Sequence, residues 1–304
     1  MDELTLSQQY AIIAFNGLES LHSSMAKEAV LRATAAAKVL EGLFKDKGEC
    51  DAETFISKLN EALECAKSLK KKEGKALEKD IFVMLEADGL MEMVPDILGC
   101  DMNYYTTGVE LKAYRSEERI YLKLREGLRA EILDEGLISI ECAVLLWLHR
   151  ESGCIHDLFS IAEQSQVQSR MMELSVSSDI YRKLWEAEFH NVMKHFAGRY
   201  LRAKKELFKN PYLEGMMVHF PYLDRRQAIF IDCVVFGTNV KERRIAAMEH
   251  LCKMGHYVEE VKNGTETLLK VDNLYYRIFP KTVCVGGAKF RVPIQGVQLM
   301  PVYW

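Results

Sequence analysis

The N-terminal segment Leu4-Thr5-Leu6-Ser7-Gln8-Gln9 begins the first of two helices on which the fold prediction depends. Thr5 and Gln8 have the spacing of a capping box, in which each side chain bonds the backbone N–H of the other residue. A second helix is predicted over residues 31–43. Its small or apolar residues at helical spacing are Ala33, Ala36, Leu40 and Leu43. A stripe of this kind lets a neighbouring element approach closely, so we expect tight packing there.

The overall composition is that of an ordinary globular protein. Of the 304 residues, 49% are hydrophobic and 28% are charged, and the length allows about two domains. The best candidate for a membrane span, residues 138–148, contains Glu141 and falls short of the roughly 18 apolar residues required. The first residues, Met-Asp-Glu, lack the regions of a signal peptide. Eight scattered cysteines are typical of reduced thiols. We therefore expect a cytoplasmic protein, and membrane association stays open.

One basic cluster stands out in a chain whose formal net charge is −4. An acidic balance counts against a general nucleic-acid binder, which normally carries a basic excess. The cluster comprises Lys67, Lys70, Lys71, Lys72, Lys75 and Lys79. Two interpretations stay open: a solvated helix end with its loop, or a patch that binds a membrane surface or a nucleic acid.

Helical periodicity extends from residue 4 to about residue 260. Four glycines that close apolar-periodic segments predict helix C-termini, and these are Gly42, Gly89, Gly136 and Gly255. Two further capping boxes, at residues 224–227 and 239–242, predict the starts of two more helices. The first of these helices would carry Ile229 and Phe230 on its apolar face.

The period of the apolar residues changes after Gly264. Short β-branched or aromatic runs occupy residues 267–271, 274–279, 283–285, 289–292 and 297–304, with glycine, proline or asparagine between them. Such runs predict a small antiparallel sheet. The predicted fold class is therefore mainly α. It comprises a single helical domain at residues 1–260, with an inserted helical segment near 155–220, and a β-rich C-terminal extension at 261–304.

Several segments resemble the Golgi phosphoprotein 3 family, whose members are mostly helical peripheral membrane proteins. Leu4-Thr5-Leu6 is similar to the start of the family, and residues 31–43 resemble its second helix, which begins Leu-Arg-Gly. Residues 124–138 are similar to a family helix of the form Arg-x-x-Leu-x-x-x-Leu-x-x-x-Gly-x-Leu. A fourth match is Tyr222-Leu223-Asp224-Arg225-Arg226, where the family has Arg-x-Asp-Arg. The resemblance implies a helical fold and a site for a phosphoinositide headgroup.

The resemblance carries the phosphate-binding role of the family onto Arg32 and Arg225, with Arg226 as a substitute. Ser23 stands where the eukaryotic members have a tryptophan, and Tyr222 replaces the first arginine of Arg-x-Asp-Arg. The site is therefore predicted to be weaker than the eukaryotic one. Both matching arginines are predicted at helix starts, where backbone N–H groups and the helix dipole favour anions. The opposing interpretation is that both arginines form surface ion pairs, each contributing about 0–1 kcal/mol.

No set of residues has the spacing of a catalytic or metal site. His190 and His195 are five residues apart, so they would diverge on a helix. Cys252 and His256 lack a second pair of zinc ligands nearby. Cys142 has the chemistry of a nucleophile, but a buried structural thiol is the ordinary interpretation. We therefore predict no catalytic residue, no metal and no cofactor.

The sequence thus predicts a non-enzymatic interaction protein, cytosolic or at a membrane surface, whose partner is an anionic headgroup surface or another protein. A competing hypothesis is a winged-helix-like regulator linked to nucleic acid, since helix–glycine–strand units also occur in winged-helix modules. The absence of a recognition helix rich in arginine, asparagine or glutamine counts against this hypothesis. A protein–protein adaptor and an enzyme are two further hypotheses for the chain.

Overall fold

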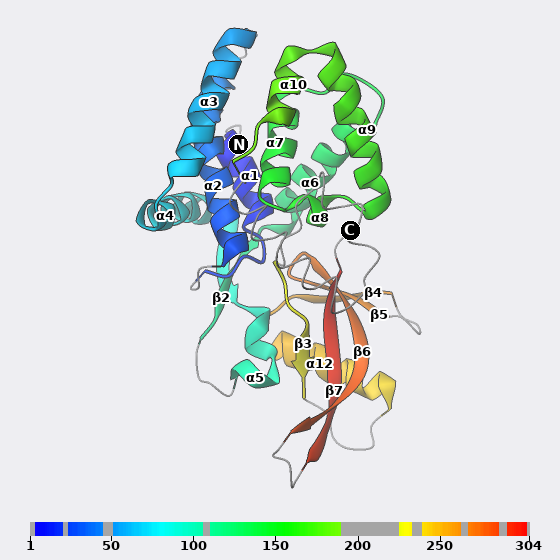
Figure 1. Cartoon of the computed structure of the whole chain (residues 1–304). Coiled ribbons are helices and arrows are strands. Elements are labelled where there is room, and N and C mark those ends of the chain that lie inside the picture. Colours follow the sequence, from blue (N-terminus) through cyan, green and yellow to red (C-terminus); the bar gives the residue numbers. More distant parts are fainter. Residues whose placement is uncertain are drawn as a thin grey trace.

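The computed structural model describes residues 4–20, 24–44, 51–105, 110–189, 225–232, 239–262, 267–285 and 291–302. A bundle of helices forms one end of the molecule, and a sheet with one helix forms the other (Figure 1). The bundle contains α1 (Leu6–Ala14), α2 (Met25–Leu40), η1 (Glu41–Leu43), α3 (Ala52–Ser68), α4 (Lys71–Ala87), α6 (Glu118–Leu133), α7 (Ile140–Glu151), α8 (Ile155–Leu158), α9 (Ile161–Ser177) and α10 (Asp179–Glu186). In these ranges, no helix has both the length and the apolar character needed to cross a membrane.

The first two helices begin at side-chain caps. The predicted capping box of α1 is confirmed, because the backbone N–H of Thr5 donates to Gln8 Oε1 at 2.8 Å and the reciprocal bond is also present. Helix α2 begins at Met25, earlier than predicted, because the Ser24 hydroxyl accepts from Lys27 N. Arg32 therefore lies inside α2 and not at a helix start.

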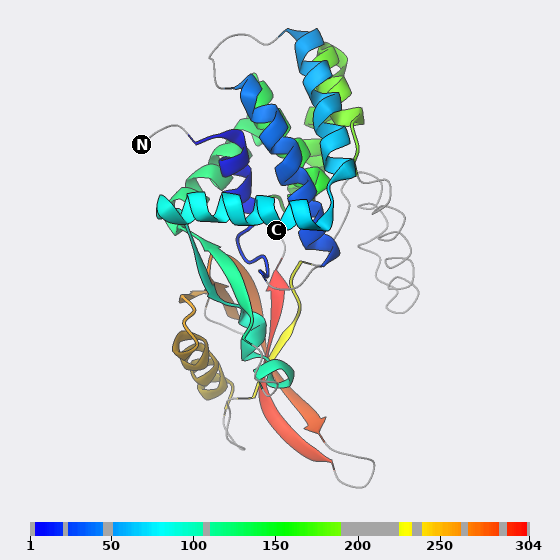
Figure 2. The same cartoon turned by 90° about the vertical axis from the view of Figure 1, so that its left-hand side faces the viewer.

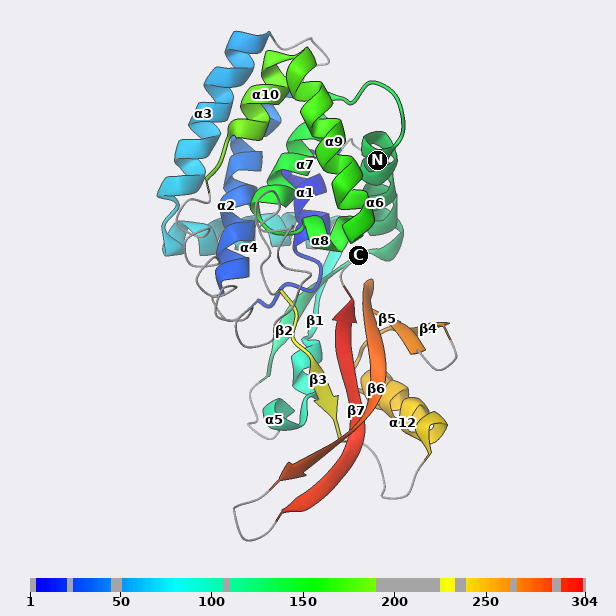
Figure 3. The same ribbon diagram turned by 45° about the vertical axis from the view of Figure 1, so that its right-hand side comes forward.

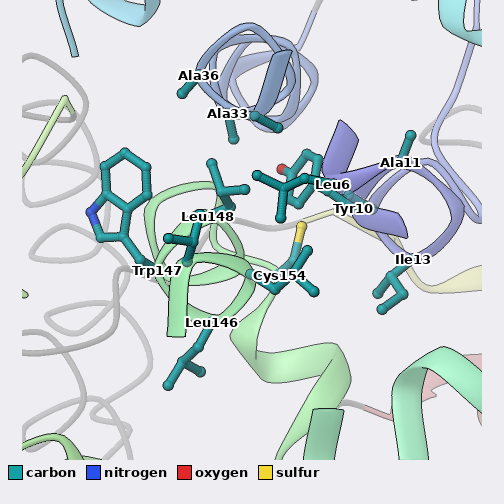
Figure 4. Close-up of a cluster of buried hydrophobic side chains, with 14 of the residues drawn as sticks. Leu6, Tyr10, Ala11, Ile13, Ala33, Ala36, Leu146, Trp147, Leu148 and Cys154 are labelled. Atoms are coloured by element: carbon teal, nitrogen blue, oxygen red, sulfur yellow. The ribbon is translucent and has the colours of Figure 1, made fainter. Parts of the chain in front are cut away.

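The core of the bundle lies where α1, α2 and α7 meet (Figure 4). Ala33 and Ala36 of α2 are completely buried, as the small-residue stripe predicts. Their small size leaves room for larger neighbours such as Tyr10 and Trp147, which are also completely buried. The indole N–H of Trp147 donates to Ala187 O at 2.9 Å, so burial leaves this donor satisfied.

A β-hairpin follows α4 and was not predicted. β1 (Met91–Pro95) pairs antiparallel with β2 (Lys112–Ser116), and η2 (Ile97–Cys100) and α5 (Met102–Tyr105) lie between these strands. The segment after α1 adds two isolated bridges to β2, at Asn16 and Glu19. The strand order is therefore the segment after α1, then β2, then β1.

The second end of the molecule is a five-stranded antiparallel sheet (Figure 3). In spatial order its strands are β3 (Ile229–Ile231), β7 (Val292–Val302), β6 (Leu274–Val285), β5 (Thr267–Val271) and β4 (Val258–Lys262). Helix α12 (Val240–Lys253) packs on the sheet through Ala247 and Leu251. These side chains share a second hydrophobic core with Cys100 of the hairpin connection.

The predicted fold class, a single mainly helical domain with a small C-terminal sheet, is wrong. Five antiparallel strands form one sheet and two form the hairpin, so strands are a major part of the architecture. The helix predicted from residue 224 is not present over the described residues 225–232, where Ile229–Ile231 form β3. By contrast, the capping box predicted at Asn239 is confirmed at the start of α12. The domain boundary predicted at residue 260 stays a prediction, although the second core includes residues from both sides of it.

The C-terminal strands show why turn residues alone mispredict strand ends. Asp272 and Asn273 form the two-residue turn between β5 and β6, with φ of 49° and 69°. Pro280, however, lies within β6, opposite Val297 of β7. Gly296 also lies within β7, opposite Lys281 of β6. Glycine is required there because a Cβ would meet Ile231 O of β3 at 2.2 Å. Strand pairing thus continues through residues that were predicted to interrupt it.

The glycine-closed helix ends are only partly as predicted. Gly89 and Gly255 follow α4 and α12 with φ of 69° and 95°, the left-handed conformation that glycine adopts without strain. Gly42 differs, because it lies within η1 and is absent from the positive-φ residues. The chain at Gly42 instead continues from the last turn of α2 into a short 3₁₀ helix.

Candidate functional site

Arg32 is held by the protein itself. Its guanidinium donates to the carbonyl oxygens of Ala66 at 2.5 Å and Lys67 at 2.8 Å, at the C-terminal end of α3. It also pairs with Glu28 one turn earlier on α2, at 2.8 Å. Backbone carbonyls at a helix C-terminus carry partial negative charge, so this cation caps α3 and ties it to α2.

Arg225 and Arg226 are also held internally, at a different place. Both guanidinium groups pair with the carboxylate of Asp157 on α8, the bond from Arg226 being 2.8 Å long. Arg225 also donates to Ala14 O at 2.5 Å, and Arg226 to Val302 O at 3.0 Å. The side chains of the two arginines are only 6% and 7% exposed. They therefore join the helical bundle to the sheet.

The structure thus brings Arg225 and Arg226 together but gives Arg32 separate partners. Burial by itself would raise the pKa of Asp157, but Arg225 and Arg226 together bring this pKa below its ordinary value. The carboxylate stays ionised and occupies the arginine forks that a phosphate would need. Arg32 and Arg225 do form ion pairs, as the opposing interpretation states, but the pair of Arg225, like that of Arg226, is buried and does not lie at the surface.

A buried imidazole lies close to this ion-pair cluster. His149 of α7 is completely buried, and its ring centroid is 4.9 Å from that of Tyr10. Burial, with a smaller effect from the charge of Arg225, lowers the pKa of His149 to about 3. The ring is therefore neutral at pH 7. Cys142 on the same helix is 4% exposed, and burial raises the pKa of its thiol, as expected for a structural cysteine.

The basic cluster, in contrast, lies on the outside of α4. Helix α4 crosses the front of the molecule in the view of Figure 2. Its inner face contributes Glu78, which pairs with Lys27 at 2.8 Å and accepts from the Tyr114 hydroxyl at 2.7 Å. Its outer face carries four exposed lysines, Lys71, Lys72, Lys75 and Lys79, and the exposed Lys70 precedes them. We call these five residues the lysine face.

The lysine face is available to a partner. Within the part of the chain that the structure describes, none of its five ammonium groups takes part in an ion pair, whereas Lys67 pairs with Glu64 at 3.4 Å. The exposed carboxylates of Glu73, Asp80 and Glu86 lie on the same helix and offset part of the charge. The helix face therefore keeps a net positive charge at neutral pH.

The order of the elements around α4 bears on the winged-helix hypothesis. A helix, a bridging segment, further helices and a hairpin follow one another, and α4 leads directly into β1. In the connection between β1 and β2, which would be the wing under that hypothesis, Cys100 and Asp101 pack against the sheet. Cys100 is completely buried there, and Asp101 accepts from Phe230 N at 2.7 Å.

A cleft of about 310 Å³ lies where the hairpin, the segment after α1 and the sheet meet. Its apolar wall includes Leu98, Leu111 and Leu274, and its carboxyl groups belong to Glu19, Asp96 and Asp272. Asp272 is already engaged, since it pairs with Arg115 at 2.8 Å and with His256 Nδ1 at 2.5 Å. Sequence reasoning missed this cleft because its residues come from segments that are far apart in the chain.

No cluster suited to a metal ion occurs among the residues that the structure describes. Cys252 is exposed on α12, whereas His256 is buried against Asp272, so these two residues have different surroundings. His190 and His195, and also the predicted Tyr222 and Ser23 positions, lie outside the described residues.

Comparisons of the chain with models of protein families, with curated proteins and with solved structures find no match. The resemblance to the Golgi phosphoprotein 3 family stays a prediction. The described residues show two groups of cations: arginines that are paired inside the molecule, and the lysine face, which is exposed on its surface.

Proposed function

We propose that this protein is a non-enzymatic interaction protein that binds anionic membrane surfaces through the lysine face of α4. The observation that carries the proposal is the set of five exposed lysines without ion pairs in the described structure. The ligand predicted from the sequence, an anionic headgroup surface, is kept in this proposal. The residues that contact it are the lysines of α4 and not Arg32, Arg225 and Arg226, whose guanidinium groups already bind protein oxygens.

The expected affinity follows from charge. Each lysine near an anionic leaflet contributes about 1 kcal/mol, and the attraction decays over a Debye length of about 8 Å at physiological ionic strength. The exposed carboxylates of Glu73, Asp80 and Glu86 reduce the summed attraction, so the interaction is reversible and sensitive to salt. Lysine suits this role, since a mobile point charge on a flexible stem does not require one fixed partner geometry.

Binding of duplex nucleic acid is a second candidate, favoured by the winged-helix order around α4. Two features place it second. Helix α4 contains no arginine, asparagine or glutamine, the residues that read base edges most often. In the described part of the connection that would act as the wing, Cys100 is buried and Asp101 accepts from Phe230 N of the sheet, so these residues pack on the protein itself.

Vesicle co-sedimentation tests the proposal. The full chain is mixed with vesicles of phosphatidylcholine alone or with added phosphatidylserine, and the triple variant Lys72→Ala/Lys75→Ala/Lys79→Ala is compared with the unsubstituted protein. We expect binding only to the anionic vesicles and a loss of about 100-fold in the triple variant, which corresponds to about 3 kcal/mol. Added salt should weaken the binding.

A matched control removes the same number of charges elsewhere. Lys123→Ala/Lys241→Ala/Lys253→Ala changes exposed lysines of α6 and α12 and should bind like the unsubstituted chain. Equal losses in the two triple variants would mean that only net charge matters, and the proposal would fail. Duplex binding, measured by fluorescence anisotropy and lost only in the α4 variant, would replace it with the second candidate.

A further inference from the structure

The outer ends of β6 and β7 form a two-stranded arm. β5 pairs with β6 only as far as Ile278, and β3 pairs with β7 only at residues 297–299. Residues 281–285 of β6 and 292–296 of β7 therefore have only each other as strand partners within the described structure. We call these two segments the arm. Figure 1 and Figure 3 show that the arm extends away from the helical bundle.

One face of the arm is apolar and exposed. Val283 lies opposite Ile294 in the antiparallel register, and their side chains therefore share a face. Val285 lies opposite Val292 on the same face, further from the sheet. Val285 is 43% exposed and Val292 is 61% exposed. Phe279, which is 41% exposed, continues this face at the base of the arm. These five residues form one apolar surface.

The opposite face of the arm is the one that packs on the protein. Gln295 lies on that face and accepts from Arg243 of α12 at 2.8 Å. An antiparallel sheet with one covered face normally has polar side chains on its other face. Here the face turned away from α12 is the apolar one. Contiguous exposed apolar side chains of this kind mark a contact site.

The charged residues around this apolar surface are all cations. After Asp272 the chain contains no aspartate or glutamate, and its charged residues there are Arg277, Lys281, Lys289 and Arg291. Arg277, Lys281 and Arg291 are exposed, and none of them takes part in an ion pair in the part of the chain that the structure describes. Side chains alternate along β6, so Arg277 and Lys281 lie on the apolar face. The complementary partner is therefore anionic.

An anionic membrane surface fits these features better than a second copy of the chain or a nucleic acid. A second copy would bring like charges together, and Pro280 and Pro293 lack the N–H that edge-to-edge pairing of strands requires. A nucleic acid is held mainly by many phosphate contacts, which the few cations of the arm cannot supply. Apolar side chains beside cations are typical of elements that bind the interface of an anionic bilayer.

We propose that the arm inserts Val285 and Val292 into an anionic membrane surface, with Arg277, Lys281 and Arg291 at the level of the headgroups. This inference rests on the proposed function in having the same partner, and it adds an apolar contact on a different element from the lysine face. Burial of apolar surface is not screened by salt. The arm therefore supplies the part of the binding that added salt does not remove.

Lipid monolayers test the insertion. The full chain is injected beneath a monolayer of phosphatidylcholine and phosphatidylserine, and a rise in surface pressure reports insertion. We expect a rise with the unsubstituted chain and little or none with Val285→Thr/Val292→Thr. On vesicles of the same composition this variant should bind about tenfold more weakly. Threonine has the β-branched shape of valine, so the strand pairing of the arm is retained.

Two controls separate the arm from other effects. Val176→Thr/Val261→Thr changes exposed valines of α9 and β4 and should behave like the unsubstituted chain. Lys72→Ala/Lys75→Ala/Lys79→Ala should still raise the surface pressure at higher protein concentration. Normal vesicle binding by this lysine variant, with loss of the pressure rise in the arm variant, would overturn the proposed function and keep the arm. The reverse result would keep the lysine face and overturn the arm.

A second variant covers a failure of the first to fold. Lys281→Ala/Arg291→Ala leaves the valines of the arm in place and should also reduce the pressure rise, because it removes the neighbouring cations. Circular dichroism confirms that each variant is folded. The inference is overturned when the unsubstituted chain causes no pressure rise, when both threonine variants lose it equally, or when folded arm variants keep it in full.

Discussion

The pair Arg225–Arg226 and the lysine face of α4 are two groups of cations with opposite surroundings. The arginines are 6–7% exposed in their side chains and share the carboxylate of Asp157, whereas the lysines are exposed and have no ion pair in the described structure. Buried charges require partners, and those partners compete with any external anion. Exposed charges contribute little to folding and are free to bind. Pairing, more than residue type, therefore separates the cations held within the fold from the cations that are available to a partner.

The largest expected effect comes from removing the shared carboxylate. Asp157→Asn removes the buried counter-charge that the two guanidinium groups share, and we expect the free energy of unfolding to fall by about 3–5 kcal/mol. Urea denaturation of the full chain measures this loss. Glu163→Gln, which removes a partner of Arg129 that is 24% exposed against 8% for Asp157, should lower the free energy of unfolding by about 1 kcal/mol or less. Similar small losses in both variants would show that the burial of the Asp157 ion pairs adds nothing to their contribution to stability.

A pH titration of stability examines the same buried region. Burial, and then Arg225, lower the pKa of His149 to about 3 in the folded protein, whereas an unfolded histidine titrates near 6.5. Below about pH 6.5 the unfolded chain therefore takes up a proton that the folded chain does not. Stability should fall by about 1.4 kcal/mol per pH unit, or about 2 kcal/mol between pH 6.5 and pH 5.

The variant His149→Phe keeps an aromatic ring beside Tyr10 and should remove most of this pH dependence. His250→Gln, which changes a half-buried histidine of α12, should leave the contribution of His149 in place. Denaturation curves at the two pH values compare the three proteins. An unchanged pH dependence in His149→Phe would contradict the assignment of the proton uptake to this residue.

Arg32 is the intermediate case, with a side chain that is 19% exposed. Arg32→Ala removes the hydrogen bonds to the last carbonyls of α3, and we expect a loss of about 1–2 kcal/mol in the free energy of unfolding. Arg32→Lys keeps the charge but not the fork, so it should recover only part of this loss. Thermal or urea denaturation of both variants checks this order of stability, with the unsubstituted chain first, Arg32→Lys second and Arg32→Ala last. A full recovery with lysine would mean that the charge alone suffices.

The sequence predicted local features better than distant pairings. The caps at Thr5 and Asn239 and the burial of Ala33 and Ala36 depend on residues within a few positions, and these predictions are confirmed. The three-residue strand β3 depends on β7, about seventy residues later in the chain, so a capping pattern before it was misleading. The turn at Asp272 and Asn273, in contrast, was marked by its asparagine.

The candidate site shows the same limit. Arg225 meets its partner Asp157 across 68 positions, and Arg32 meets Ala66 across 34. Nothing near either arginine in the sequence distinguishes a buried ion pair from an exposed cation. The lysine cluster was visible in the sequence because its members lie on one helix at helical spacing. Whether those lysines are exposed depends on which face of α4 packs on the bundle. Glu78, which is buried and pairs with Lys27, lies on the packed face.

The smallest expected effect on stability belongs to the lysine face. Lys72→Ala, Lys75→Ala and Lys79→Ala each remove an exposed side chain without an ion pair, so each should change the free energy of unfolding by about 0.5 kcal/mol or less. The same variants should have the largest effect on anionic vesicles. Asp157→Asn should show the reverse, with a large effect on the free energy of unfolding and a small effect on binding to vesicles. A loss of several kcal/mol in a lysine variant would reveal a structural partner for that lysine and remove it from the binding surface.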